Sequence, residues 1–587
     1  MKLFRTAVGL LCTAALLLCS VTAGLSASAA SFSVSGLFSD NAVLQQKVPV
    51  TVTGYGETGA TVTVSISGYN VRTETVTCIV NDRGKWTAEL SPRDGSYTKY
   101  TVTAKCGKTT LKSTGILFGE VWIAGGESSI ASKLSEADYA EYAKELLSER
   151  ARVCVMSPEE KEDDGSSVKV VSPASFSWSV CSDKSVIGLP EIPVMFALKM
   201  RKELDLPVAV ICTTSDTSAV ASWLGANYIN TDLEGKLRAS GAYDTADPDY
   251  YPSSLYNSHV LPLCDVSAAG LLWAAGEGDR GNTDLLLNSA DALIYQMRDL
   301  FQYDATCSFS FIFAQNEQHL DSYTASAVNN ALITAAAKYP SAYTLPVYDL
   351  GREITDGQSS DLSSQAESSV SSAASSDAAS SDTSSDAAEP TLPAFPENRT
   401  LWGRFCGTAA AKHYKTAEYT FPSLLKVDCD ATGAELMFGN TGEGLTSANG
   451  AAVEGFCLIY ADTRTVIPVS AEIISSDSVR LIFGDAPLAG ASLGYAYGEC
   501  AASADLFTKA GIPVQPFNRA VNLTDENIEP LTPSVTTPSA VVSENDSKGE
   551  DKRTMLIVVI CIGGALLIAV LGIVVAIRAN KRNNSLI

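Results

Sequence analysis

The sequence predicts an α/β protein whose central parallel sheet is flanked by two β regions, with one transmembrane helix near the C-terminus. Three observations carry this prediction. Apolar strand-like runs alternate with helix-like stretches between residues 116 and 350, which is typical of a parallel sheet covered on both faces. The regions before and after it contain strand-like runs without helices between them. Finally, 23 uncharged residues at 555–577 are enough to cross the hydrocarbon core of a bilayer.

The first 30 residues have the pattern of a secretory signal peptide. Lys2 and Arg5 precede an apolar stretch, and the small residues at 27–30 offer a cleavage site. An uncleaved membrane helix is the alternative. Because the mature chain would begin near residue 31, we exclude residues 1–30 from the fold.

Residues 31–115 are predicted to form a small β-sandwich. Alternating runs at 50–53, 61–66 and 99–104 favour strands, and glycines mark the turns between them.

Residues 116–415 are predicted to form the central α/β domain. Its expected strands are 116–124, 207–212, 270–275, 309–314 and 345–350, and its expected helices are 136–150, 194–204, 284–301 and 325–338. In such sheets active sites gather at the carboxyl ends of the strands. A Ser/Ala/Asp-rich insert at 358–389 is expected to be disordered.

The remaining chain is divided into a second β region at 416–520, a Pro/Thr/Ser-rich stalk at 521–554, the predicted membrane span and a short tail at 578–587. Three basic residues follow the span at once: Arg578, Lys581 and Arg582. Positive residues remain on the cytoplasmic side of a membrane. The sequence therefore predicts a single-pass protein of the cell membrane with an extracellular ectodomain. A buried core helix is the alternative for the span.

Charge and histidine content restrict the chemistry. The chain has 42 Lys and Arg against 66 Asp and Glu, a formal net charge of −24, which disfavours a nucleic-acid partner. It has only three histidines, His259, His319 and His413. We therefore expect no metal site and no cofactor.

Eleven cysteines lie outside the signal peptide and the predicted span, an odd number without CxxC spacing. A full disulfide framework is not implied. Cys78 and Cys106 are a candidate local disulfide pair, and buried free thiols are the alternative.

Five motifs resemble the sialate O-acetylesterase family. They are Leu37–Gln46, Gly84–Trp86, Gly119–Trp122, Ser254–Asn257 and Gly511–Phe517, and they occur in the family's order. The resemblance extends from about residue 33 to 520. It implies an N-terminal β-domain, a flavodoxin-like SGNH-type hydrolase domain, and removal of acetyl groups from sugar hydroxyls.

The resemblance places Ser128 at the position of the catalytic nucleophile. Here the family's Gly-Gln-Ser-Asn-Met turn reads Gly126 to Ile130, with Glu127 in place of Gln and Ser129 in place of Asn. A carboxylate beside the nucleophile is expected to oppose the build-up of negative charge on an oxyanion.

Two further family blocks are altered. A Gly-Gly-Thr loop that helps to form the oxyanion hole is here Ser215-Asp216-Thr217-Ser218, followed by Trp223, so the glycines are lost. The block Trp-Tyr-Gln-Gly-Glu-Ser-Asn reads Trp273-Ala274-Ala275-Gly276-Glu277-Gly278-Asp279. Gly276 and Glu277 survive, whereas the polar residues expected to face the substrate do not.

The fourth block supplies the family's acid and base, as Asp-x-His-Pro. Here Pro393 stands at the Asp position and Phe395 at the His position, before Gly403-Arg404. His259 is expected to be packed or on the surface, and His413 is expected to be exposed. His319, in a loop after a strand, is the remaining candidate for a base.

Three hypotheses follow. The first is a surface-anchored relative of these esterases that is catalytically impaired and binds glycan through the inherited cleft. The second is an active carbohydrate O-acetylesterase that acts on sialic acid or other glycans with Ser128 as nucleophile and Glu277 as a substitute partner. The third is a structural adhesion or envelope protein whose cleft is filled.

Overall fold

The computed structural model describes most of the chain from residue 31 to residue 520. The described ranges are 31–157, 175–279, 281–304, 308–316, 321–350, 396–430, 432–448, 450, 452–486 and 488–520. The predicted signal peptide, the 358–389 insert, the stalk and the tail lie outside them. Within these ranges no helix combines the length and the apolar character that crossing a membrane requires. The predicted span at 555–577 also lies outside, so the structure gives it no support.

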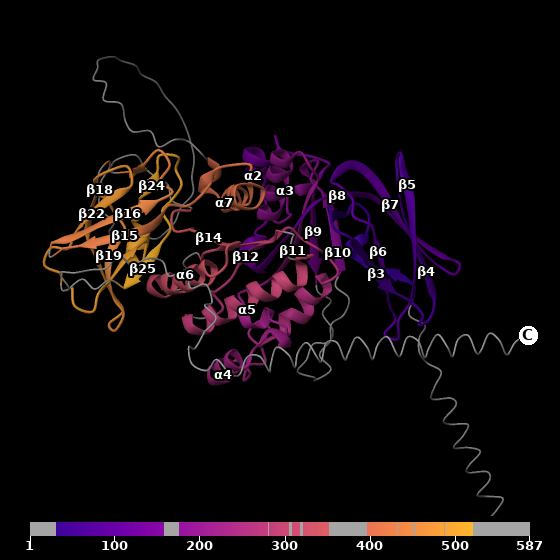
Figure 1. The fold of residues 1–587 in the computed structure, drawn as a ribbon, viewed down its shortest axis with the longest axis horizontal. Coiled ribbons are helices and arrows are strands. Elements are labelled where there is room, and N and C mark those ends of the chain that lie inside the picture. The colour runs from indigo at the N-terminus through magenta and orange to yellow at the C-terminus, as the bar shows by residue number, and fades with distance from the viewer. Residues whose placement is uncertain are drawn as a thin grey trace, which may run out of the picture. The chain divides into compact units, whose positions relative to one another are not determined.

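A mixed sheet forms the centre of the molecule, as the sequence predicts (Figure 1). Its strand order is β10-β9-β11-β8-β12-β13-β14, and all neighbours are parallel except β10 and β9. The strands are β8 (Thr109–Glu127), β9 (Ala151–Ser157), β10 (Ser175–Val180), β11 (Val208–Ser215), β12 (Gly270–Ala274), β13 (Ser310–Ala314) and β14 (Ala342–Leu345).

Helices cover both faces of this sheet (Figure 1). On one face lie α3 (Glu191–Leu204) and α7 (Leu401–Thr408), and on the other lie α5 (Thr283–Phe301) and α6 (Ser322–Ala337). Side chains of β8 alternate between the two cores: Val121 and Ile123 pack on the α5 side, and Trp122 packs on the α3 side. This period of two is what a strand buried on both faces requires. The short α4 (Thr231–Ala239) contacts α5.

The N-terminal region contains two sheets, one of which is joined to the central domain through the long strand β8. The first is β1-β3-β6, and the second places β5, β4 and β7 beside the first half of β8. Their bounds are β1 (Ser33–Val34), β3 (Val50–Tyr55), β4 (Thr61–Gly68), β5 (Val71–Ile79), β6 (Lys85–Leu90) and β7 (Ser96–Cys106). A further strand, β2 (Val43–Gln45), pairs with β8. The expected boundary between 115 and 116 falls inside β8, where Gly115 adopts φ +70°.

The C-terminal region contains a five-stranded sheet, β15-β16-β22-β21-β18, and a four-stranded sheet, β20-β19-β23-β25, around a separate core. The bounds are β15 (Ser423–Cys429), β16 (Gly433–Gly439), β18 (Ala452–Val453), β19 (Phe456–Tyr460), β20 (Thr465–Pro468), β21 (Ser470–Ile473), β22 (Ser478–Ile482), β23 (Ser492–Tyr495) and β25 (Phe517–Ala520). The pair β17 (Leu445–Thr446) and β24 (Phe507–Thr508) lies beside them.

Two expected elements are wrong. The helix expected at 136–150 is only α2 (Glu136–Asp138) and a π-turn at Tyr139–Ala143, because the chain must turn before entering β9, which pairs with β11. The strand expected at 345–350 ends at Leu345, where Pro346 supplies no N–H for the ladder. Strands β9 and β10 were not predicted.

The candidate disulfide between Cys78 and Cys106 is also wrong. Both residues pair in register with Val62 of β4, one from β5 and the other from β7. They are therefore separated by two strand spacings, about 9.5 Å, whereas a disulfide needs Cα atoms less than about 7 Å apart. Both thiols are free.

Candidate functional site

The register of four parallel strands brings the predicted site residues to the same edge of the sheet. The last pair of β11 and β8 is Ser215 with Glu127, and β12 aligns Ala274 with Gly126 and with Ala314 of β13. The segments that follow these strands, which contain Asp216, Ser128, Gly276 and Asn316, therefore leave the sheet at its carboxyl edge. The sequence blocks quoted above therefore meet at the edge where such sheets bind ligands.

The turn after β8 exposes Ser128. Gly126 has φ +96°, and a Cβ on it would lie 1.9 Å from the carbonyl oxygen of Ala274, so only glycine allows this close approach. The 3-10 turn Ser128–Ala131 begins immediately, with Ser128 and Ser129 exposed and Ile130 buried. An exposed hydroxyl on a strand-to-helix turn is the arrangement that a serine nucleophile needs.

Glu127 lies beneath this exposed serine and carries a neutral carboxyl group at neutral pH. Its side chain is 4% exposed, and its Oε1 accepts a 3.1 Å hydrogen bond from the backbone N–H of Gly278. Burial raises the pKa of Glu127 to about 8, with further increases from the nearby carboxyls of Glu277 and Asp279. The expectation of a negative charge beside the nucleophile is therefore wrong at pH 7, because the buried carboxyl of Glu127 keeps its proton.

Asp279 is a second buried acid of this site, and sequence reasoning did not single it out. It is 7% exposed, its Oδ2 accepts a 3.2 Å hydrogen bond from the N–H of Val220, and its Oδ1 has no partner within the described residues. Burial raises the pKa of Asp279 to about 7. By the resemblance, Glu127 stands where the family has Gln and Asp279 where it has Asn. When protonated, each acid is a neutral, nearly isosteric replacement for the amide.

Glu277 lies on the turn after β12, shortly before Asp279, and its side chain is half-buried. The following Gly278 is in close contact with the loop after β11, since a Cβ on it would lie 2.2 Å from the Ser218 carbonyl oxygen. The loops after β11 and β12 are thus packed directly on each other. Ser128, Glu277 and Asp279 belong to one contiguous site.

The loop that replaces the family's glycines is held by aromatic packing. Trp223 donates a 2.9 Å hydrogen bond from Nε1 to Oγ of Ser218, and its ring packs 5.0 Å from that of Trp273. Asp216 is exposed. An acidic side chain therefore follows β11 at the position beside Ser128 where the resemblance expects glycine.

The two described histidines lie in different environments. His259 is 5% exposed and packs 5.2 Å from the ring of Trp223, which confirms the expectation of a packed side chain. His413 was expected to be exposed, but the structure shows it half-buried. Its ring packs 5.3 Å from that of Trp122, with Nδ1 3.1 Å from Oγ of Ser310. Because Ser310 begins β13, His413 lies at the opposite edge of the sheet, about 20 Å along β8 from Ser128. His319 lies outside the described residues.

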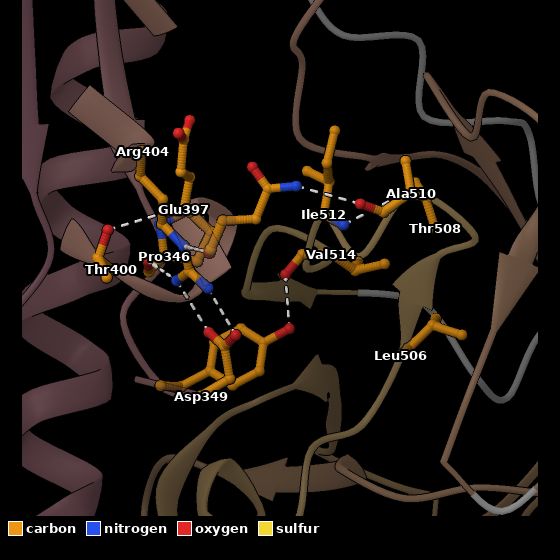
Figure 2. A network of polar contacts seen from close by, with 12 residues as sticks. Pro346, Asp349, Glu397, Thr400, Arg404, Leu506, Thr508, Ala510, Ile512 and Val514 are labelled. Carbon is orange, nitrogen blue, oxygen red and sulfur yellow. Dashed lines mark hydrogen bonds and ion pairs between the residues drawn. The ribbon is translucent and has the colours of Figure 1, made fainter. Parts of the chain in front are cut away.

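Pro393 and Phe395 also lie outside the described residues. Arg404 of the same block is described, and Figure 2 shows its polar contacts. Its guanidinium donates to both carboxylate oxygens of Asp349, at 2.8 and 2.5 Å, and its Nε donates to the Asn398 carbonyl at 2.9 Å. Arg404 is fully buried and the Asp349 side chain is 7% exposed. This bidentate pair fixes α7 to the chain after β14.

Comparisons with known proteins agree with this fold. No protein-family model matches the chain. The sialate O-acetylesterases of Pongo abelii and Homo sapiens are each 24% identical to it over 276 residues, which cover 45% of this chain and 52% of theirs. That of Mus musculus is 24% identical over 341 residues, 48% of this chain and 59% of its own. The chain thus spans about half the length of the curated relatives it matches.

A crystal structure of a carbohydrate acetylesterase from Xanthomonas citri superposes on this chain with a TM-score of 0.62 at 20% identity. The superposition covers 83% of this chain and 99% of that one, so the two proteins share a fold. The chain thus has the fold of this carbohydrate acetylesterase. The relatives agree with the resemblance seen in the sequence: over about half of its length the chain is similar to sialate O-acetylesterases.

Proposed function

We propose that this chain is a cell-surface relative of the carbohydrate O-acetylesterases that binds acetylated glycan in the inherited cleft and hydrolyses it poorly. The observation that carries the proposal is the set of groups around Ser128. An exposed hydroxyl is accompanied by two buried acids whose pKa values are raised: Glu127, to about 8, is largely protonated at pH 7, and Asp279, to about 7, is protonated in about half of the molecules. A protonated acid cannot accept the serine proton.

The residues at the family positions of the base and its orienting acid support the same conclusion, and His319 is the remaining candidate for a base. Attack by serine on an ester needs a general base, usually histidine oriented by an acid. The family positions for these groups hold Pro393 and Phe395. Of the described histidines, His259 packs against Trp223 and His413 lies at the far edge of the sheet. Removing such a base costs on the order of 10⁴ in rate.

The donors for an oxyanion are impaired as well. Asp216 replaces a glycine beside Ser128 and adds a side chain of the wrong charge for a developing oxyanion.

An active carbohydrate O-acetylesterase is the second candidate, and one observation favours it. Because the carboxyl of Glu127 is neutral at pH 7, it does not oppose the oxyanion in the way a charged glutamate would. Ser128 would then act with Glu277, which is half-buried on the adjoining turn. Turnover that depends on Ser128 separates this candidate from the first.

Membrane anchoring is part of the proposal and rests on the sequence alone. The basic residues after the apolar run 555–577 place the tail in the cytoplasm and the glycan-binding ectodomain outside. Protease added to intact cells should then remove residues 31–520. Full protection of these residues would contradict the assignment.

The function is tested by binding followed by recovery of the ligand. The full-length chain is mixed with O-acetylated sialosides and with their de-acetylated counterparts, and bound ligand is analysed by mass spectrometry. We expect capture of the acetylated ligand with its acetyl group intact, loss of capture in Ser128→Trp, and unchanged capture in Ser470→Trp, which alters an exposed serine on β21. Failure to capture any glycan, or recovery of ligand de-acetylated in a Ser128-dependent manner, would contradict the proposal.

A further inference from the structure

Two buried cysteines meet where the C-terminal β region packs on α6. Side chains of β19 alternate between two environments: Leu458 lies in the C-terminal core, whereas Cys457 faces a smaller cluster that also contains Tyr497 and Cys500. Side chains of α6 pack against this smaller cluster. Cys457 is fully buried, and Cys500 is 5% exposed. The two residues, distant in the sequence, therefore share one interface between two parts of the chain.

The backbone after β23 brings Cys500 back to β19. Strand β23 pairs with β19, and Gly494 lies directly opposite Cys457. A Cβ on Gly494 would lie 3.0 Å from Sγ of Cys457, so a larger residue would crowd this thiol. The chain then turns at Gly498, with φ +59°, into the short 3-10 helix η11 (Gly498–Ala502), which carries Cys500.

The two thiols are in direct contact. The Cys457 thiol donates a hydrogen bond to Sγ of Cys500. Sγ of Cys457 also lies 3.9 Å from the carbonyl oxygen of Tyr497, the residue before η11. A disulfide bond is about 2 Å long, so sulfur atoms already in hydrogen-bonding contact reach that distance through a small change of side-chain rotamer.

The two thiols differ in acidity. The hydrogen bond from Cys457 lowers the pKa of the Cys500 thiol below its usual value. The same bond, together with burial, raises the pKa of the Cys457 thiol. Because the thiolate is the attacking species in disulfide exchange, Cys500 is the residue that reacts first.

We propose that Cys457 and Cys500 form a disulfide bond that holds η11 on β19. The oxidant is a small-molecule or protein disulfide of the oxidising environment outside the cell, where the proposed function places this region. The inference does not depend on glycan binding. Because both thiols are buried in the folded chain, the exchange takes place during folding or local opening.

The exchange proceeds in two steps. The Cys500 thiolate attacks one sulfur of the oxidant, which forms a mixed disulfide and releases one thiol of the oxidant. Cys457 then loses its proton and attacks Sγ of Cys500, so that the mixed disulfide breaks and the second thiol of the oxidant leaves. The chain loses two protons and two electrons, and the disulfide of the oxidant becomes two thiols.

The disulfide fixes η11 against the central domain. The backbone N–H of Gly498 donates a 2.9 Å hydrogen bond to Oγ of Ser326 on α6. Ala501 and Ala502 of η11, and Asn316 after β13, are among the residues that line a pocket of about 300 Å³. The cross-link therefore stabilises one wall of this pocket, and it also restricts the unfolded chain between the two cysteines.

Peptide mapping of the full-length protein tests the bond. The protein is incubated with reduced and oxidised glutathione at a urea concentration just below its unfolding transition, so that access to the thiols is not limiting. Remaining thiols are blocked with iodoacetamide, and the protein is digested without reduction and analysed by mass spectrometry. Melting temperatures are compared before and after reduction with dithiothreitol. Cys500→Ala removes the bond, and Cys106→Ala, which changes a half-buried cysteine of β7, is the control.

We expect the peptide with Cys457 to be recovered linked to the peptide with Cys500. Reduction should lower the melting temperature by several degrees in the wild type and in Cys106→Ala, and should leave it unchanged in Cys500→Ala. The mapping needs no variant, so a folding defect in Cys500→Ala does not obscure it. Recovery of both peptides with blocked thiols, or linkage of either cysteine to a different one, overturns the proposal.

Discussion

Oε1 of Glu127 accepts a 3.1 Å hydrogen bond from the backbone N–H of Gly278, which ties the residue before Ser128 to the loop after β12. The bond exists in a buried environment, where Glu127 is 4% exposed. Burial raises the pKa of Glu127 to about 8, although the Gly278 hydrogen bond by itself favours the ionised form. In addition, the backbone N–H of Gly278, near Ser128, already has a hydrogen-bond partner.

The first prediction concerns stability against pH. The folded state holds the Glu127 proton up to about pH 8, whereas the unfolded chain releases it near pH 4.5. Raising the pH through this window therefore favours unfolding, and a pKa change of one corresponds to about 1.4 kcal/mol. Glu127→Gln should match the wild type near pH 4.5 and exceed its free energy of unfolding by several kcal/mol at pH 8, as measured by denaturant titration.

The control for this experiment is Glu443→Gln, which changes an exposed glutamate in the C-terminal region. Its free energy of unfolding should follow the wild type at every pH. If Glu127→Gln shows the same pH dependence as Glu443→Gln, Glu127 does not titrate as described.

The second prediction concerns the buried ion pair. Arg404→Met leaves the carboxylate of Asp349 buried without its partner, and breaking such a pair costs about 3–5 kcal/mol. Arg464→Met removes a largely exposed ion pair with Asp321 and should cost under about 1 kcal/mol. Denaturant unfolding measures both. The double change Arg404→Met with Asp349→Leu should recover much of the loss, and equal effects of the two single changes would contradict a structural role for the pair.

The third prediction concerns the Ser/Ala/Asp-rich insert. Arg404 binds Asp349 on one side of residues 351–395 and Asn398 on the other, so both flanks of this segment are held at one point. Deleting 358–389 removes no residue with a described contact and shortens the connection, a change worth about 1 kcal/mol in loop entropy. The melting temperature should change by about 2 °C or less. A drop of more than about 10 °C would show that the insert packs against the domain.

Several elements of the fold were predictable because their patterns are strong. The central strands are continuous apolar runs, helix α5 carries clear 3.6-residue periodicity, and Asn282 and Asp321 are the N-caps of α5 and α6. The position of Ser128 was predicted from the family resemblance, which aligns the turn Gly126–Ile130 with that of the nucleophile. These features depend on local sequence alone.

Other features depended on tertiary contacts that the sequence does not display. The stretch 136–150 has helical composition, but the pairing of β9 with β11 ends it early. The protonation of Glu127 arises from burial and from the neighbouring acids of another loop. The pocket lined by Asn316 needs two regions more than 150 residues apart in the chain to meet, which no local pattern signals.

The central claim is that Ser128 is no longer a catalytic nucleophile, and acetyl release tests it most directly. Purified full-length protein and its Ser128→Ala variant are incubated with a generic acetyl ester and with an O-acetylated sialoside, and released acetate is measured over time. The account predicts the same rate for both proteins, equal to that of buffer alone. Release by the wild type that is abolished by Ser128→Ala would contradict it, and Glu277→Gln would then identify the substitute partner.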